Sequence, residues 1–305
     1  MLTSSAPEPT CPDWLLTKAR RAQPVATAIV NAVNDVALQS ARDATDAGII
    51  TPVLVGEGDA MKRAADSIGW DIATFEVIEA NGEQAAAEAG AKAAGGGAVG
   101  ALMKGHLHTD IFMRAALSRD AGLRIGKPLT HHFHLTLGDQ PSGLIITDAA
   151  LNPAPDATIK QASITNADAL SKATGIARPK VALLSATEVP TDKVPSSVEA
   201  RDLAAWARDH VNDADVDGPL AFDLAVSPQA VAIKGVTSPV AGAADIIVVP
   251  EIVSGNALYK AMVQYLGACA AGVVLGAKVP ILLTSRADPP AARLASAALA
   301  GLMTP

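Results

Sequence analysis

The chain has 305 residues, of which half are hydrophobic and only 3 % aromatic, and it carries a formal net charge of −7. This length predicts two α/β domains or one large one, with a core built from Ala, Val, Leu and Ile. The negative charge argues against a nucleic-acid partner, because phosphate backbones require a basic surface. No apolar run reaches the length of a membrane span, so we expect no membrane partner.

The two cysteines, Cys11 and Cys269, are far apart in the sequence and do not form a disulfide framework. Their number fits a reducing cytosol, so we expect a cytoplasmic protein. The residues before Pro12 are polar and rich in proline, and they lack the basic-then-apolar pattern of a signal peptide. We expect them to form a short disordered tail.

Strand and helix patterns alternate through the first part of the chain. Apolar runs predict strands at 25–30, 51–55, 73–78 and 98–103, and helical patterns follow at about 35–47, 59–68, 82–94 and 109–118. Asn34 and Asp35 are suited to cap the first of these helices, and Gly48 to end it. Such alternation indicates a parallel sheet with helices on both faces.

The pattern changes after Gly122. Residues 129–137 alternate as a strand, further strands are predicted at 143–147, 180–185, 244–250 and 279–283, and helices begin near Asp156 and at 197. Two short segments, 218–226 and 230–234, lie between them, and 291–302 reads as a closing helix. We predict a first domain of residues 1–142 plus 286–305, a second of residues 143–285, and an active site in the cleft between them.

Polar residues next to glycine follow three of the predicted strands. Open α/β sheets bind ligands in crevices at the carboxyl ends of their strands. The candidates at these ends are Ser285, Arg286 and Asp288 after one strand, Lys104, His108, Thr109 and Arg114 after a second, and Ser254, Asn256 and Lys260 after a third.

Each of these residue types suits an anionic ligand, but each also has a purely structural explanation. The guanidinium of Arg286 matches phosphate or carboxylate, or forms a surface salt bridge. Backbone N–H groups near Thr109 make an anion site, whereas Arg114 is also placed for an ion pair with Asp110. Asp288 precedes two prolines and an alanine-rich run, which is typical of a helix N-cap.

Asn256 is likewise suited to cap a helix, with Lys260 solvated on it. A zinc site built from His106, His108 and Asp110 is permitted by their spacing. Alternating histidines such as His132 and His134 are more often a polar strand face, and we expect no metal.

The sequence lacks several fingerprints of other enzymes. It has no G-x-G-x-x-G at the first strand–helix turn, no G-x-x-x-x-G-K-[ST] and no G-x-S-x-G elbow. Dinucleotide binding, P-loop nucleotide binding and a serine-hydrolase elbow therefore have no motif to support them.

Several motifs in the same order resemble the phosphate acetyltransferase/phosphate butyryltransferase family. They occupy residues 102–105, 107–110, 122–124, 217–223, 233–235, 238–250, 254–256 with Lys260, and 273–288. The Leu-His-Thr-Asp motif at 107–110 is similar to the transferase portion of proteins fused to an enoyl-CoA hydratase-like domain.

The resemblance implies a two-domain, three-layer α/β/α fold with mostly parallel sheets, similar to isocitrate and isopropylmalate dehydrogenases, and usually a homodimer. It implies transfer of an acetyl or short acyl group such as butyryl between coenzyme A and inorganic phosphate, without a metal or a tightly bound cofactor. The serine–arginine pair of the family corresponds to Ser285 and Arg286, and its phosphate-holding arginine to Arg114.

One departure from the family concerns the base for the coenzyme A thiol. In the acetyltransferase branch an aspartate stands seven residues after the serine, and here that position is Ala292. Asp288 and His108 are both candidates to take the proton, and the sequence does not decide between them. We expect direct transfer between the bound substrates, because Ser285 has no evident His–Asp partners and Cys269 lies in an apolar stretch.

Two other functions remain open at this stage. Ala292 is compatible with a non-catalytic module that binds coenzyme A or acyl phosphate. An NAD-dependent decarboxylating dehydrogenase of related fold would need metal-binding carboxylates, which the motifs do not clearly supply.

Overall fold

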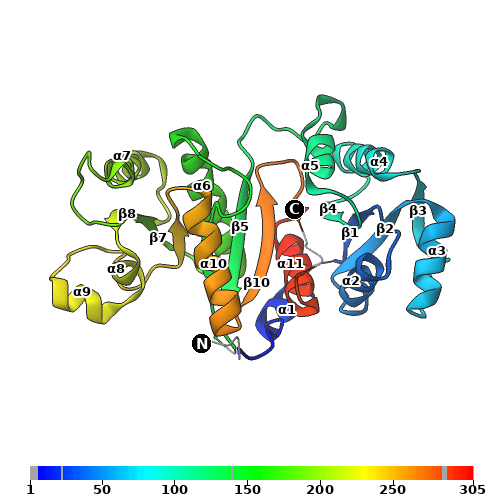
Figure 1. The fold of residues 1–305 in the computed structure, drawn as a ribbon, viewed down its shortest axis with the longest axis horizontal. Helices are drawn as coiled ribbons and strands as arrows, with labels where there is room; N and C mark the ends of the chain where they lie inside the picture. The colour runs from blue at the N-terminus through cyan, green and yellow to red at the C-terminus, as the bar shows by residue number, and fades with distance from the viewer. Residues whose placement is uncertain (1–5, 22, 139, 284–286, 305) are drawn as a thin grey trace. The chain divides into compact units, whose positions relative to one another are not determined.

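The computed structural model describes residues 6–21, 23–138, 140–283 and 287–304 (Figure 1). The chain divides into two compact units. The first unit comprises Pro9–Lys127 and Ala271–Pro305, and the second Met1–Glu8 and Pro128–Ala270. The predicted boundary at residue 143 separates two strands that pair with each other: β5 (Thr130–Thr136) lies antiparallel to β6 (Leu144–Thr147) in the second unit.

The first unit is a mostly parallel sheet with helices on both faces. Its strand order is β3-β2-β1-β4-β11-β10, and the only antiparallel pair among these described strands is β10–β11. The strands are β1 (Val25–Val30), β2 (Ile50–Gly56), β3 (Glu76–Glu79), β4 (Ala101–Lys104), β10 (Cys269–Leu275) and β11 (Ile281–Leu282).

Two groups of helices cover this sheet (Figure 1). One group comprises α1 (Asp13–Ala19), α2 (Asp35–Asp46), α3 (Gly58–Ser67) and α11 (Pro290–Leu302), which contact one another in turn. The other comprises α4 (Glu83–Gly95), α5 (Thr109–Leu117) and a short 3-10 turn, Arg119–Ala121.

The second unit repeats this architecture. Its strand order is β5-β6-β9-β7-β8, parallel apart from β5–β6. The remaining strands are β7 (Lys180–Leu184), β8 (Asp215–Leu220) and β9 (Ile246–Val248). The helices are α6 (Ala157–Thr174), α7 (Pro195–His210), α8 (Phe222–Val226), α9 (Pro228–Lys234) and α10 (Ile252–Leu266).

Local sequence signals explain most element boundaries. The Asn34 side chain accepts a hydrogen bond from the Ala37 N–H at 3.0 Å, as predicted for the cap of α2. Asp156 caps α6 in the same way, by accepting from the Ile159 N–H. Gly48 follows α2 with a φ of +72°, a conformation that glycine adopts without steric cost.

Two predicted caps are wrong because the helices begin elsewhere. The N-cap of α11 is Pro289, so Asp288 precedes the cap position, and Pro290 occupies the first turn, where its missing N–H costs nothing. The N-cap of α10 is Glu251, whose carboxylate accepts from Val253 and Ser254 N–H groups, so Asn256 lies inside the first turns.

The core is aliphatic, as the composition predicts. In the second unit it gathers small and branched side chains around the sheet, among them Leu135, Ile146, Leu220, Leu224, Val240 and Ile247. In the first unit the fully buried large side chains include Leu15, Ile29, Leu38, Leu54 and Phe112. Burying such side chains is the main stabilising term in each unit.

Candidate active site

The carboxyl edge of the first unit's sheet brings two of the predicted site segments into neighbouring positions. Strand β4 pairs in parallel with β11, in the register Leu282 opposite Met103. It also pairs in parallel with β1, in the register Lys104 opposite Val30. The chain therefore leaves all three strands at the same edge of the sheet. Lys104, the last residue of β4, is only 9 % exposed.

The loops after β1 and β4 are fastened together. The His106 N–H donates to the Asn31 carbonyl at 3.0 Å, and the Asn31 side-chain amide donates to the His106 carbonyl at 2.5 Å. The Asn34 amide nitrogen lies 3.0 Å from His106 Nδ1. These contacts fix where the β4–α5 loop points.

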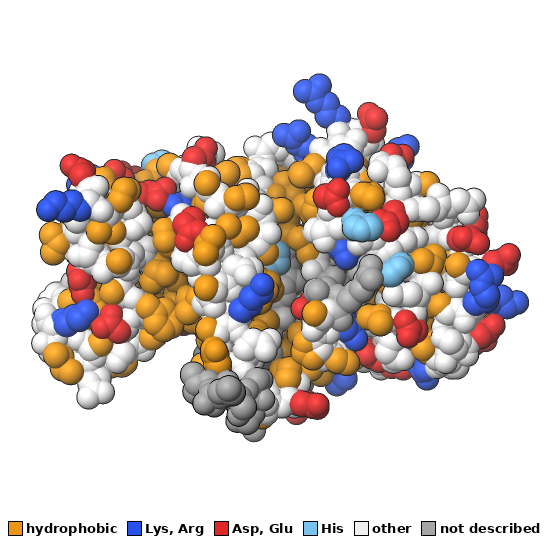
Figure 2. Space-filling view, in the orientation of Figure 1, with side chains coloured by type: hydrophobic (Ala, Val, Ile, Leu, Met, Phe, Trp, Pro, Cys, Tyr) orange, Lys and Arg blue, Asp and Glu red, His pale blue; other side chains and the backbone are white. Residues whose placement is uncertain are grey.

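His108 is held by a carboxylate from another helix. Glu83, in the first turn of α4, accepts from the His108 backbone N–H at 2.9 Å and lies 2.8 Å from His108 Nδ1, both through Oε2. The hydrogen bonds from the His108 backbone and side chain lower the pKa of Glu83. Figure 2 shows histidine side chains at the surface in the region where Figure 1 draws β1 and β2.

Arg114 lies on α5 in a pocket of about 290 Å³. The pocket also holds Lys92 and Glu88 of α4, so its lining carries both signs of charge. The expected ion pair between Arg114 and Asp110 is present at 3.2 Å, with both side chains 69 % exposed. Such an exposed pair is weak, so Arg114 can exchange it for an anionic ligand at small cost.

The serine–arginine pair falls on residues that the structure does not describe. Ser285 and Arg286 lie outside the described residues and follow β11 in the sequence. Asp288 is described, and its backbone carbonyl accepts from Arg293 Nη1 at 2.6 Å. Ala292, at the position of the acetyltransferase aspartate, is 4 % exposed on α11.

The third predicted segment belongs to the second unit. The Ser254 hydroxyl donates to the Glu251 carbonyl at 2.8 Å, and the Asn256 amide donates to the Ala149 carbonyl at 3.3 Å. Lys260 is exposed on α10. Both Ser254 and Asn256 thus support the start of α10, which is a structural role beside the predicted binding role.

A buried carboxylate that the sequence analysis missed shapes this region. Asp148 accepts from the Ala150 and Leu151 N–H groups through Oδ1, and from the His131 N–H and the Asn152 amide through Oδ2. Four donors on two oxygens satisfy the carboxylate. Asp148 therefore anchors the loop after β6, whose Ala149 carbonyl receives Asn256.

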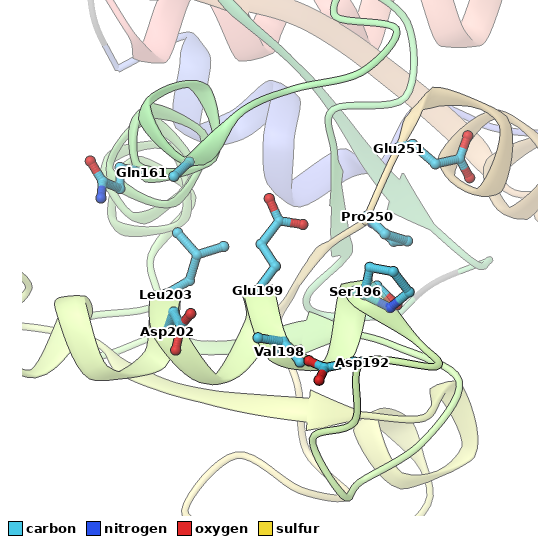
Figure 3. Close-up of a pocket in the computed structure, with 11 residues that line it drawn as sticks. Gln161, Asp192, Ser196, Val198, Glu199, Asp202, Leu203, Pro250 and Glu251 are labelled. Carbon is cyan, nitrogen blue, oxygen red and sulfur yellow. The ribbon is translucent and has the colours of Figure 1, made fainter.

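Figure 3 shows a pocket of about 880 Å³ within the second unit. Its acidic lining consists of Asp192, Glu199, Asp202 and Glu251, set among apolar side chains such as Pro195, Val198 and Leu203. Beside it, the buried Lys160 ammonium binds the Glu199 carboxylate. A lining of carboxylates repels phosphate groups, so this pocket is unsuited to acyl phosphate.

Cys269 and the β5 histidines are buried. Cys269 is 3 % exposed, as predicted, and burial raises the pKa of its thiol to about 11, so it is not a thiolate nucleophile at neutral pH. His132 and His134 lie on one strand face, as predicted, and are buried.

Within the described ranges, no group of three or more His, Cys, Asp or Glu side chains gathers as a metal site would, and His106 and His108 instead contact Asn34 and Glu83. Among the helices of these same ranges, none combines the length and apolarity of a membrane span.

Comparison with known proteins gives the class of the fold first. A solved branched-chain phosphotransacylase from Enterococcus faecalis V583 superposes with a TM-score of 0.80 at 29 % identity, covering 92 % of this chain and 100 % of its own. The fold is therefore that of a phosphotransacylase.

Sequence comparison then gives the family. Residues 85–300 match the family described as Phosphate acetyl/butaryl transferase. A phosphate acetyltransferase of Rhizobium meliloti is 40 % identical over 97 % of this chain and 94 % of its own length. A phosphate butyryltransferase of Clostridium acetobutylicum is 35 % identical over 94 % and 95 %. The chain belongs to the phosphate acetyl/butyryl transferase family, which confirms the resemblance seen in the motifs.

Proposed function

We propose that this protein transfers an acetyl or short acyl group, such as butyryl, directly between coenzyme A and inorganic phosphate bound together. The observation that carries the proposal is family membership over nearly the whole chain, including the segments that hold the predicted site residues. The pairing of β4 with β11 supports the proposal. These two strands are parallel neighbours; Lys104 ends β4, and the Ser285–Arg286 segment follows β11 in the sequence.

The chemistry assigns a task to each group. The phosphate or acyl phosphate needs converging cations, for which Arg286, Arg114 and Lys104 are suited. The carbonyl oxygen becomes negative in the tetrahedral transition state, and the Ser285 hydroxyl with nearby N–H groups such as that of Thr109 can donate to it. Holding both substrates in reactive geometry contributes further to the rate.

A direct transfer is favoured over an acyl-enzyme on Cys269. The thiol is buried and its pKa is raised to about 11, so the thiolate that would attack is scarce at neutral pH. We further propose that the enzyme works in the cytoplasm with no tightly bound cofactor. Its two units correspond to the domains of isocitrate and isopropylmalate dehydrogenases in this proposal. Substrate binding also involves Ser254, Asn256 and Lys260.

A homodimer is also part of the proposal. Helix α10 supports it, because among its residues only Gly255 is buried while Val253, Tyr265 and Leu266 are 70 %, 57 % and 53 % exposed. Leu258, Tyr259, Met262 and Val263 of α10 pack against the core, so the exposed apolar side chains form one face of the helix. Such a face is a suitable surface for a second copy of the chain.

The experiment that tests the site is the substitution Arg286→Ala, with Arg286→Lys as its matched control. Loss of one preorganised electrostatic contact lowers kcat by about a hundredfold or more. Lysine keeps the charge but not the planar fork of donors, so we expect an intermediate loss. The assay is release of the coenzyme A thiol from acetyl-CoA or butyryl-CoA with phosphate added. Wild-type rates in Arg286→Ala at saturating phosphate contradict the assignment.

A further inference from the structure

Glu83 and His108 form a carboxylate–imidazole pair at the carboxyl edge of the first unit's sheet. Glu83 Oε2 lies 2.8 Å from His108 Nδ1 and accepts from the His108 backbone N–H at 2.9 Å. The Glu83 side chain is 31 % exposed, whereas that of His108 is 71 % exposed. The pair is thus shielded at the carboxylate and open at the ring.

This arrangement determines which ring nitrogen is basic. An ionised carboxylate only accepts hydrogen bonds, so the hydrogen between the two groups belongs to Nδ1 of His108. In the neutral ring Nε2 then carries the free lone pair. The backbone N–H bond holds the same oxygen of Glu83 and prevents the carboxylate from turning away. A histidine base oriented by an acidic partner at Nδ1 is the arrangement of a catalytic dyad.

The pair stands where the proposed reaction needs a base. His108 is the N-cap residue of α5, in the loop that leaves β4. The neighbouring parallel strand β11 precedes the Ser285–Arg286 segment in the sequence. The position that carries the aspartate in the acetyltransferase branch holds Ala292, a buried side chain that cannot take a proton.

We propose that His108, oriented by Glu83, is the general base that takes the proton from the coenzyme A thiol. The inference rests on the proposed function and deepens it. Nε2 accepts the thiol proton as the sulfur attacks the carbonyl carbon of the acyl phosphate and forms the C–S bond. The C–O bond to phosphate then breaks, and the imidazolium returns the proton to the departing phosphate oxygen. In the reverse direction, Nε2 takes the proton from the phosphate oxygen as that oxygen attacks the thioester, and the imidazolium gives it to the leaving sulfur when the C–S bond breaks.

A purely structural role is the alternative, since the same contacts join the starts of α4 and α5. The substitution His108→Asn separates the two roles. Asparagine is a good N-cap, keeps the backbone N–H that Glu83 accepts, and places an amide nitrogen near the position of Nδ1, but it has no basic nitrogen. A structural role predicts nearly unchanged turnover in this variant, whereas the loss of a general base lowers kcat by about a hundredfold or more, with little change in KM.

The pH dependence of turnover also distinguishes the two roles, because a purely structural role of His108 would not change it. Coenzyme A thiols ionise near pH 8.5, so at higher pH the thiolate is already present and needs no base. We expect the deficit of His108→Asn in the acyl-phosphate-to-thioester direction to shrink as pH rises from 7 to 9. The ring contacts Glu83 of α4, and the charge of Glu83 is also affected by His106 of the preceding loop. Further along α5, Asp110 and Arg114 pair with each other.

Two further variants complete the test. Glu83→Gln removes the charge that orients the ring, and we expect a loss smaller than that of His108→Asn. Asp288→Asn, at the other candidate base, is expected to stay within about fivefold of wild type, a change below the range of general-base loss.

If the wild type is active and His108→Asn has nearly the same turnover, the role of His108 as base is wrong while the proposed function stands. A hundredfold loss found only in Asp288→Asn leads to the same conclusion. A wild type without phosphate-dependent thiol release overturns the proposed function and the inference with it. We expect an active wild type, a loss of turnover in His108→Asn that becomes smaller at high pH, and turnover close to wild type in Asp288→Asn.

Discussion

Gly105 occupies a position where the backbone leaves no room for a side chain. A Cβ at this residue would lie 2.9 Å from the Asn31 carbonyl oxygen and closer still to that of Val30. Both neighbours are backbone atoms of the fastened β1 loop and cannot turn aside. The glycine therefore lets the two loops of the candidate site approach each other.

The substitution Gly105→Ala is expected to lower the stability of the chain by about 1–3 kcal/mol, the usual cost of overpacking. The measurement is the urea unfolding midpoint. The matched control is Gly301→Ala in α11, where the new Cβ would meet only Ile49 Cγ2 at 3.7 Å. Alanine there is expected to stabilise the helix by up to about 1 kcal/mol. Equal midpoints for the two variants contradict this account of the loop.

Glu83 and Asp148 show which site residues the sequence does not predict. Glu83 lies 25 residues before His108, and its contact depends on how α4 and α5 pack. Asp148 is recognisable as important only once four donors are seen to meet its two oxygens. The positions of Lys104 at the end of β4 and of His108 and Arg114 on the following helix, in contrast, were predictable, because strand ends and helices are visible as local patterns. Their roles in the site stay predictions.

Strand β5 carries three buried histidines whose protonation opposes folding. Burial lowers the pKa of His131 to about 4, of His132 to about 3 and of His134 to about 4; Asp148 partly offsets the effect at His131, and His131 adds to it at His132. In the unfolded chain these rings have a pKa near 6.5. The unfolded state therefore takes up protons between pH 6.5 and 4 that the folded state excludes.

Stability is accordingly expected to fall as the pH drops below about 6.5, by roughly 1.4 kcal/mol per pH unit for each histidine. The measurement is the free energy of urea unfolding from pH 7 to pH 5. The variant His132→Gln keeps a hydrogen-bond partner for Thr130. In this variant, unfolding is expected to take up about one proton fewer, so the free energy of unfolding should depend less steeply on pH. His210→Gln, at an exposed ring at the end of α7, serves as the control. A pH dependence that is the same in both variants contradicts the role of β5.

The elements themselves were largely predictable. Strand β1 has the predicted bounds, because its run is apolar apart from Thr27 and lies between Pro24 and Asn31. Helix α1 was missed because its seven residues follow a proline-rich segment and are too few for a clear helical period. The segment 218–226 was left without a strand or helix assignment, and it holds the end of β8 and the helix α8. Strand β8 is hard to predict because Asp and Gly within it disfavour strand formation locally, while pairing with β7 maintains it.

For the molecule as a whole, the family and the α/β class followed from motifs in fixed order, whereas pairing across long separations did not. The antiparallel pairing of β5 with β6 places residues 130–136 with the second unit. Periodicity along the chain marks strands but not their partners, so the sequence could not show this.

Acyl transfer between coenzyme A and inorganic phosphate is the activity expected of the whole molecule. The most direct measurement is thiol release from acetyl-CoA and butyryl-CoA by the full chain, with and without phosphate and with NAD present. We predict release that requires phosphate, forms acyl phosphate in equal amount and leaves NAD unreduced. Binding of acyl-CoA without release, or reduction of NAD, would contradict the account.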